Sequence, residues 1–211
     1  MKLNLRYFCL ALGVGAAFSA KASLVNPGFE TGNTTGWTPA LDGGADAVVT
    51  THTAYDGVFT YAAPDGNNFL TLTGGAANDV VTLSQTFSLN AGDAITVWAA
   101  IDMRDVKTHD QQADVLWNGV VVWHKDQFSS DLSTPEPGHT SWQSLVLTAA
   151  STGLYTLAFD VYQGTTPSGG YQSVAGLFDV AVPEPSTLLA GGLMALVTLL
   201  GFASPKRRRA A

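Results

Sequence analysis

The 211-residue sequence predicts an all-β fold: an antiparallel β-sandwich of the jelly-roll type over residues 23–181, with a helical segment at each end. Apolar residues alternate with Thr and Ser over 81–89 and resume at 95–101, the period of half-buried strands. Asn118-Gly119 stands between two apolar runs, as in a two-residue hairpin turn. Sustained helical periodicity is missing between the two ends. Many short strands with Gly, Asp and Pro turns favour a two-sheet sandwich.

The first 22 residues have the pattern of a secretory signal peptide. Lys2 and Arg6 precede an apolar run at 8–18 that is too short to span a bilayer. Ala20-Lys21-Ala22 then places small residues where a signal peptidase reads them, which predicts cleavage after Ala22. A buried N-terminal helix is the alternative.

The exported part is expected to contain further strands. In chain order, the strand-like runs are 69–73, 81–89, 95–101, the hairpin at 114–123, 142–149, 154–162 and 174–182. Each is short and ends at turn-forming residues. We therefore expect one domain of about 160 residues, long enough to bury a core without disulfides. Cys9 lies within the signal segment, so the mature chain has no cysteine.

Residues 182–211 combine an apolar segment with a basic end. No charged residue occurs from 186 to 204, where six leucines dominate. Nineteen helical residues span roughly 28 Å, close to the hydrocarbon thickness of a bilayer. Four basic residues follow: Lys206, Arg207, Arg208 and Arg209. The sequence thus predicts a single transmembrane helix with its C-terminus in the cytoplasm.

A Pro-Glu-Pro motif precedes this segment, in Val182, Pro183, Glu184 and Pro185. Each proline fixes its own φ and disfavours helix at the residue before it, so Val182 and Glu184 should be extended. A protease groove usually binds an extended segment, and Glu184 adds one charge. Alternatively, the prolines merely start a permanent anchor helix.

The motif, the short membrane helix and the basic cluster resemble, in order and spacing, the PEP-CTERM sorting signal. Such tails are also labelled as the C-terminal domain of ice-binding-type proteins. The resemblance implies processing by an exosortase in a Gram-negative bacterium that makes exopolysaccharide and biofilm. The implied route runs through signal peptidase and a transient single pass of the inner membrane, with the N-terminus outside, to the cell surface or extracellular matrix.

Charge is distributed very unevenly along the chain. All 17 acidic residues lie between 23 and 185, with only three basic residues, Arg104, Lys107 and Lys125, so this part carries 3 − 17 = −14. Such a domain repels nucleic acid and anionic lipid surfaces, which excludes both as partners. It attracts divalent cations.

Two segments resemble the opening and closing strands of galactose-binding-like jelly rolls, the fold of many carbohydrate-binding modules: "LVNPGFETGNTTGWT" (24–38) and "GLFDVAV" (176–182). The resemblance implies one structural Ca²⁺ on Glu30 and Asp179. Because calcium takes six to eight oxygen ligands, further groups are needed, and Asp56 in the loop 53–57 is a candidate. Alternatively, Glu30 and Asp179 simply cap a turn and a strand end.

Sugar binding would require exposed aromatic rings. Trp98 should point away from the apolar side of its strand, and Trp117 and Trp123 flank the predicted hairpin closely enough to lie near each other across it. These three are candidate sugar-stacking residues. Tryptophans paired across strands are, however, more often part of a core, and Trp37 is expected to be core.

Catalytic motifs are weak. The four histidines show no zinc-site spacing, and no Gly-x-Ser-x-Gly elbow occurs. The segment 102–114 clusters four aspartates, which could include an acid/base pair of a glycoside hydrolase or lyase but reads more readily as a solvated loop. We therefore expect a non-catalytic adhesion or polysaccharide-binding module, with an enzyme acting on exopolysaccharide as the alternative. An ice-binding protein ranks lower, since the threonines form no regular repeat.

Overall fold

The computed structural model describes residues 24–75, 77–105, 110–133, 138–164 and 173–182. These residues form strands and loops and contain no helix. The strands are β1 (Thr38–Ala40), β2 (Ala45–Val49), β3 (Thr51–Thr53), β4 (Thr60–Ala62), β5 (Phe69–Thr73), β6 (Asp79–Leu89), β7 (Ala94–Asp102), β8 (Gln111–Trp117), β9 (Val120–Asp126), β10 (Gln143–Thr148), β11 (Gly153–Gln163) and β12 (Ala175–Ala181).

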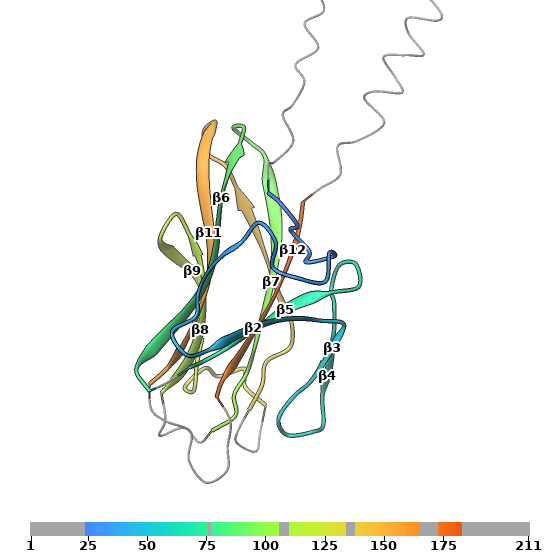
Figure 1. Cartoon of the computed structure of the whole chain (residues 1–211), viewed down its shortest axis with the longest axis vertical. Coiled ribbons are helices and arrows are strands. Elements are labelled where there is room, and N and C mark those ends of the chain that lie inside the picture. Colours follow the sequence, from blue (N-terminus) through green and yellow to red (C-terminus); the bar gives the residue numbers. More distant parts are fainter. Residues whose placement is uncertain (1–23, 76, 106–109, 134–137, 165–172, 183–211) are drawn as a thin grey trace, which may run out of the picture.

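Two five-stranded sheets face each other (Figure 1). Sheet A has the strand order β1-β6-β11-β8-β9, and sheet B has the order β10-β7-β12-β5-β2. Every strand pair in them is antiparallel. The predicted all-β antiparallel sandwich is therefore confirmed for the described residues.

The alternation in the sequence determines which side chains enter the core. In β6, the odd-numbered residues from Val81 to Leu89 are buried, and in β7 the same holds from Ile95 to Ile101. The predicted hairpin turn is also present, because Asn118 and Gly119 both have positive φ, 52° and 77°, as a type I′ turn requires.

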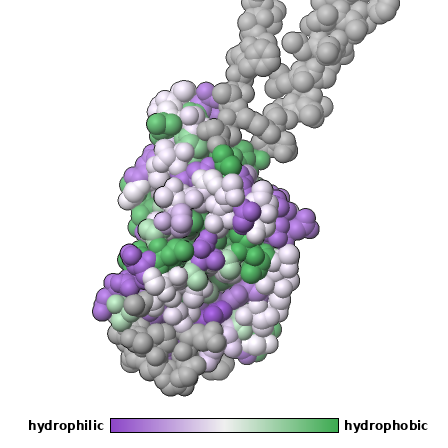
Figure 2. All heavy atoms as spheres, viewed as in Figure 1, coloured by the Kyte–Doolittle hydropathy of each residue, from purple (hydrophilic) through white to green (hydrophobic). Residues whose placement is uncertain are grey.

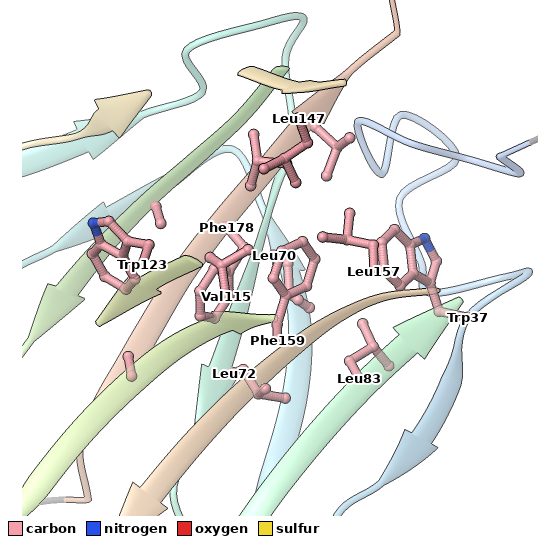
Figure 3. Close-up of a cluster of buried hydrophobic side chains, with 14 of the residues drawn as sticks. Trp37, Leu70, Leu72, Leu83, Val115, Trp123, Leu147, Leu157, Phe159 and Phe178 are labelled. Carbon is pink, nitrogen blue, oxygen red and sulfur yellow. The ribbon is translucent and has the colours of Figure 1, made fainter. Parts of the chain in front are cut away.

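A stack of four aromatic rings joins the two sheets. Phe159 of sheet A lies 4.4 Å from Phe178 of sheet B, centroid to centroid, and 5.3 Å from Trp37 on its other side. Phe29 continues the stack, 5.2 Å from Trp37. Figure 3 shows Trp37, Phe159 and Phe178 among the leucines between the sheets. The sequence prediction that Trp37 is a core residue is confirmed.

The segment before β1 is fixed to this core. Gln85 binds the backbone of Val25 twice, through its Oε1 to the Val25 N–H at 2.6 Å and its Nε2 to the Val25 carbonyl at 3.0 Å. Phe29 has a φ of 57°, a costly conformation for a bulky residue, and its complete burial in the ring stack offsets that cost. The first described segment and the end of β12 lie toward the same end of the sandwich (Figure 1), and the face seen in that view carries hydrophilic and hydrophobic residues side by side (Figure 2).

A small third layer covers part of sheet B. The hairpin of β3 and β4 lies against the outer face of that sheet, with Tyr61 fully buried over Ala100 and Leu177. Trp142 packs against Tyr61 at 5.7 Å and against Phe69 at 5.4 Å. Beyond this second hydrophobic cluster, the described residues leave part of the outer face uncovered.

Both predicted targeting segments fall outside the described residues. This applies to the signal peptide at 1–22 and to Pro183, Glu184, Pro185, the span 186–204 and the basic residues 206–209. Among the residues that are described, no helix could cross a membrane.

Candidate functional site

The uncovered part of the outer face of sheet B forms an open shelf. Ser144 of β10, Trp98 of β7 and Asp179 of β12 stand directly opposite one another in a row. The next row contains Val146 and Thr96. We call Thr96, Trp98, Ser144 and Val146 the Trp98 shelf. Ser144 and Val146 are exposed, Val146 by 68 %, whereas Trp98 and Thr96 are half-buried.

Trp98 differs from the other four tryptophans in lacking partners. The indole N–H groups of Trp37, Trp123 and Trp142 donate to an oxygen of Asn26, Gln143 and Ala62, respectively. Trp117 stacks on Tyr155 at 5.0 Å. Within the described residues, Trp98 has neither a hydrogen bond nor a ring contact. As expected from the sequence, it stands on the opposite face of β7 from Val97 and Ala99.

The hairpin tryptophans do not form a sugar platform. Trp123 is only 8 % exposed and belongs to the core. Trp117 packs against the same core, beside Phe87 and Tyr155. A β-bulge explains this, because the register shifts after Val115 and places Trp123 opposite this inward-facing residue. A regular hairpin would have put Trp123 opposite the outward-facing Asp114.

Beside the shelf, two carboxylates hold the loop 64–68 by its backbone. Asp179 accepts a hydrogen bond from the N–H of Asp65 at 3.0 Å and another from its neighbour Val180. Glu30 accepts the N–H groups of Asn67 and Asn68 at 2.9 and 2.8 Å. The loop therefore stays close to β12 and covers Asp179, whose exposure is 0 %.

These carboxylates titrate differently. Burial raises the pKa of Asp179 to about 7, and the negative charges of Asp65 and Glu30 add to the rise against two hydrogen bonds that oppose it. Desolvation also acts to raise the pKa of Glu30, but its hydrogen bonds from Asn67 and Asn68 outweigh that effect and lower it. Asp65 and Glu30 thus both disfavour the ionised form of Asp179 at the edge of the shelf.

Of the three residues proposed for calcium, the structure brings Glu30 and Asp179 to the same loop but places Asp56 elsewhere. Asp56 Oδ2 lies 2.9 Å from His139 Nδ1. The backbone N–H of Tyr55, next to Asp56, donates to Asp102. Asp102 stands opposite Ala175 of β12, which lies four residues, or about 13 Å, along that strand from Asp179. In the part of the chain that the structure describes, no three acidic, histidine or cysteine side chains are arranged as a metal site.

A second polar cluster lies beneath the β3–β4 hairpin. Asp102 is 1 % exposed and accepts from Arg104 Nε at 3.1 Å, with His52 Nε2 2.8 Å away. Ser133 Oγ and Asp56 Oδ2 both lie 2.9 Å from the same nitrogen of His139, Nδ1. A catalytic triad needs the two partners on opposite ring nitrogens, so this geometry instead ties the hairpin to the sandwich.

The aspartates of 102–114 diverge. Asp102 ends β7 in sheet B, whereas Asp114 lies on the outer face of sheet A, opposite Asp160. Burial raises the pKa of Asp160, with Asp114 adding to the rise and a hydrogen bond from Thr82 opposing it. His124 Nδ1 lies 2.6 Å from Asp114 Oδ1. Asp160, Asp114 and His124 form a row on the outer face of sheet A. Because Asp102 lies in the other sheet, Asp102 and Asp114 do not form the acid/base pair considered for the segment 102–114.

Sequence reasoning missed two members of the site. Asp65 lies in a Pro-Asp-Gly turn shortly before the predicted strand 69–73. This position in a turn is the only feature of the sequence that could have indicated a role for it. Ser144 had none, because 46 residues separate it from Trp98 and only the strand order makes them neighbours.

No family model matches the chain, and no curated protein matches its sequence. Several solved structures are similar in fold. The carbohydrate-binding module TmCBM61, in complex with beta-1,4-galactotriose, is 18 % identical with a TM-score of 0.41 over 78 % of this chain and 100 % of its own. The K3 cleaved adhesin domain of Lys-gingipain from Porphyromonas gingivalis is 16 % identical, with a TM-score of 0.47 over 77 % and 99 %.

The enzymatically active domain of tailspike protein 4 from bacteriophage CBA120 is 12 % identical, with a TM-score of 0.41. That match covers 77 % of this chain but 21 % of the tailspike chain. At these identities and TM-scores, the similarities concern the fold alone.

Proposed function

We propose that this protein is an exported, non-catalytic β-sandwich that binds a glycan on the Trp98 shelf. The observation that carries the proposal is a half-buried indole ring on the open part of a sheet face that, among the described residues, has no hydrogen bond or ring contact. Of the two hairpin tryptophans on sheet A, Trp123 is buried in the core and Trp117 packs against it, stacked on Tyr155, while the third layer covers part of Trp142. A half-buried tryptophan beside exposed Ser144 and half-buried Thr96 offers an apolar platform for a sugar ring and hydroxyl partners for its hydroxyl groups.

Replacing Trp98 with alanine tests this function. The variant should bind its glycan about 10- to 100-fold more weakly, because an aromatic anchor at the centre of a small site supplies most of its affinity. Binding is measured on a glycan array and then by titration with the best ligand. Val121→Ala, which truncates an exposed side chain on sheet A, is the control and should bind normally. Unchanged binding by Trp98→Ala would place the site elsewhere.

We also propose that the tail is removed at the Pro-Glu-Pro motif. Support comes from β12, the last strand among the described residues, which ends at Ala181, while Val182 still packs against the core. Pro183 therefore follows this strand closely, and cleavage after Val182 would leave the described sandwich whole. Mass spectrometry of the surface form should find no peptide from residues 188–209. Intact tail peptides there would contradict the proposal, and a Pro183→Ala/Pro185→Ala variant should retain them.

A structural Ca²⁺ bound by Glu30 and Asp179, with Asp65 in the place expected for Asp56, is our third proposal. All three offer the oxygen ligands that calcium prefers, and a cation would offset both the burial that raises the pKa of Asp179 and the smaller effect of the charges of Asp65 and Glu30. In this structure the three carboxylates are not arranged as a metal site, so binding would require them to move together and to exchange some of their backbone hydrogen bonds for the metal. The measurable consequence is a change in how stability depends on pH.

A further inference from the structure

The charges around the Trp98 shelf are all of one sign. Asp179 is the cross-strand neighbour of Trp98, and the charges of Asp65 and Glu30 are close enough to act on Asp179. Because the exported part carries −14 in total, the long-range field adds to this local potential. A ligand with carboxylate, sulfate or phosphate groups would meet repulsion on approach.

Among the described residues, the basic side chains that could offset this repulsion form ion pairs away from the shelf. Within the described ranges, the lysine and arginine positions are 104 and 125 only. Arg104 binds Asp102 beneath the hairpin, and Asp102 lies four residues along β7 from Trp98, or about 13 Å. Lys125 lies on β9 in the other sheet, with its Nζ 2.8 Å from Asp131.

Backbone N–H groups can also bind anions, and the loop 64–68 presents several beside the shelf. Those of Asp65, Asn67 and Asn68 already donate to the protein's own carboxylates, Asp179 and Glu30. An incoming anion would have to displace a carboxylate that is held in place by the fold. These three backbone N–H groups of the loop are therefore already occupied and do not attract an anionic ligand.

We propose that, in the absence of bound calcium, the shelf selects neutral glycans and rejects polysaccharides that carry uronate, sulfate or phosphate groups, so its selectivity is measured in the presence of a chelator. This inference rests on the proposed glycan-binding function. What the shelf offers is an indole ring and the hydroxyls of Ser144 and Thr96, which suit the apolar face and hydroxyl groups of an uncharged sugar.

The test uses the full chain and polysaccharides matched in backbone but not in charge. Polygalacturonate and its fully methyl-esterified form are one such pair, run in affinity electrophoresis beside a panel of neutral glucans and galactans. We expect retardation by at least one neutral polymer and none by polygalacturonate. The affinity for the neutral polymer should change less than about twofold between about 50 and 500 mM NaCl, since no charge pair is formed.

A variant that adds a cation sharpens the test. Ser144→Lys places an ammonium group beside Trp98 and should gain measurable, salt-sensitive binding to polygalacturonate, while Ser144→Ala should not. Binding of an acidic polymer by the unchanged protein, abolished by Trp98→Ala, would overturn the neutral preference and leave the glycan site standing. Failure to bind any glycan, neutral or acidic, would overturn the proposed function itself.

Discussion

Replacing Phe159 with alanine is expected to lower the free energy of unfolding by about 3–5 kcal/mol, a large part of the stability of a domain of this size. Phe159 is fully buried and lies between Trp37 and Phe178. Its removal leaves a cavity in the middle of the ring stack and takes away the surface on which Trp37 rests. The effect should therefore reach the segment before β1 as well as both sheets.

Equilibrium unfolding in urea gives this value directly. Leu154→Ala in the same strand is the matched control: Leu154 is 71 % exposed, and its truncation should change the free energy of unfolding by about 0.5 kcal/mol or less. A loss below about 1 kcal/mol for Phe159→Ala would mean that the ring stack does not join the two sheets. Faster proteolysis near residue 30 in the variant would show that the first segment has loosened.

Without calcium, the protein is expected to lose stability as the pH rises from about 4 to 7. An unfolded aspartate ionises near its ordinary pKa of 3.8, whereas folded Asp179 keeps its proton to about pH 7. Between these values the folded state holds one more proton than the unfolded state, so each step up in pH favours unfolding. The contribution of Asp179 amounts to about 1.4 kcal/mol per pH unit, and on the order of 4 kcal/mol at most.

Asp179→Asn separates this contribution from the other titrating groups. Its amide oxygen can accept one of the two backbone N–H groups, so the variant should be about 1 kcal/mol less stable than the unchanged protein at pH 4. At pH 8 it should be the more stable of the two, because it has no buried charge. Melting temperatures in chelator across this range should therefore cross, and parallel curves would contradict the assignment to Asp179.

Calcium adds a second arm to the same experiment. If the ion binds the ionised carboxylates, millimolar Ca²⁺ should raise the melting temperature of the unchanged protein at pH 8 and much less at pH 4. The Asp179→Asn variant should lose most of that response. Mg²⁺, which demands a tighter octahedral site, is the control ion. No response to calcium at pH 8 would remove the proposed metal.

The hairpin region shows how far local pattern reaches. Asn118-Gly119 predicts the turn because few dipeptides adopt positive φ at both positions. No feature of the sequence predicts the bulge after Val115, which directs the Trp123 side chain toward the core. A bulge depends on how the strand packs against its neighbours, and a shift of one residue changes the face on which every later side chain lies.

The sequence by itself determined the class of fold and the inward residues of β6 and β7, because alternation over a strand is a local property that burial on one face imposes. The same alternation predicts that Trp98 points away from the core. Only the tertiary structure decided that Ser144 and Asp179 flank it and that Asp65 rather than Asp56 lies beside Asp179. These are choices of strand order and register between distant segments, and the free energy that makes them comes from packing the two sheets and the hairpin layer together.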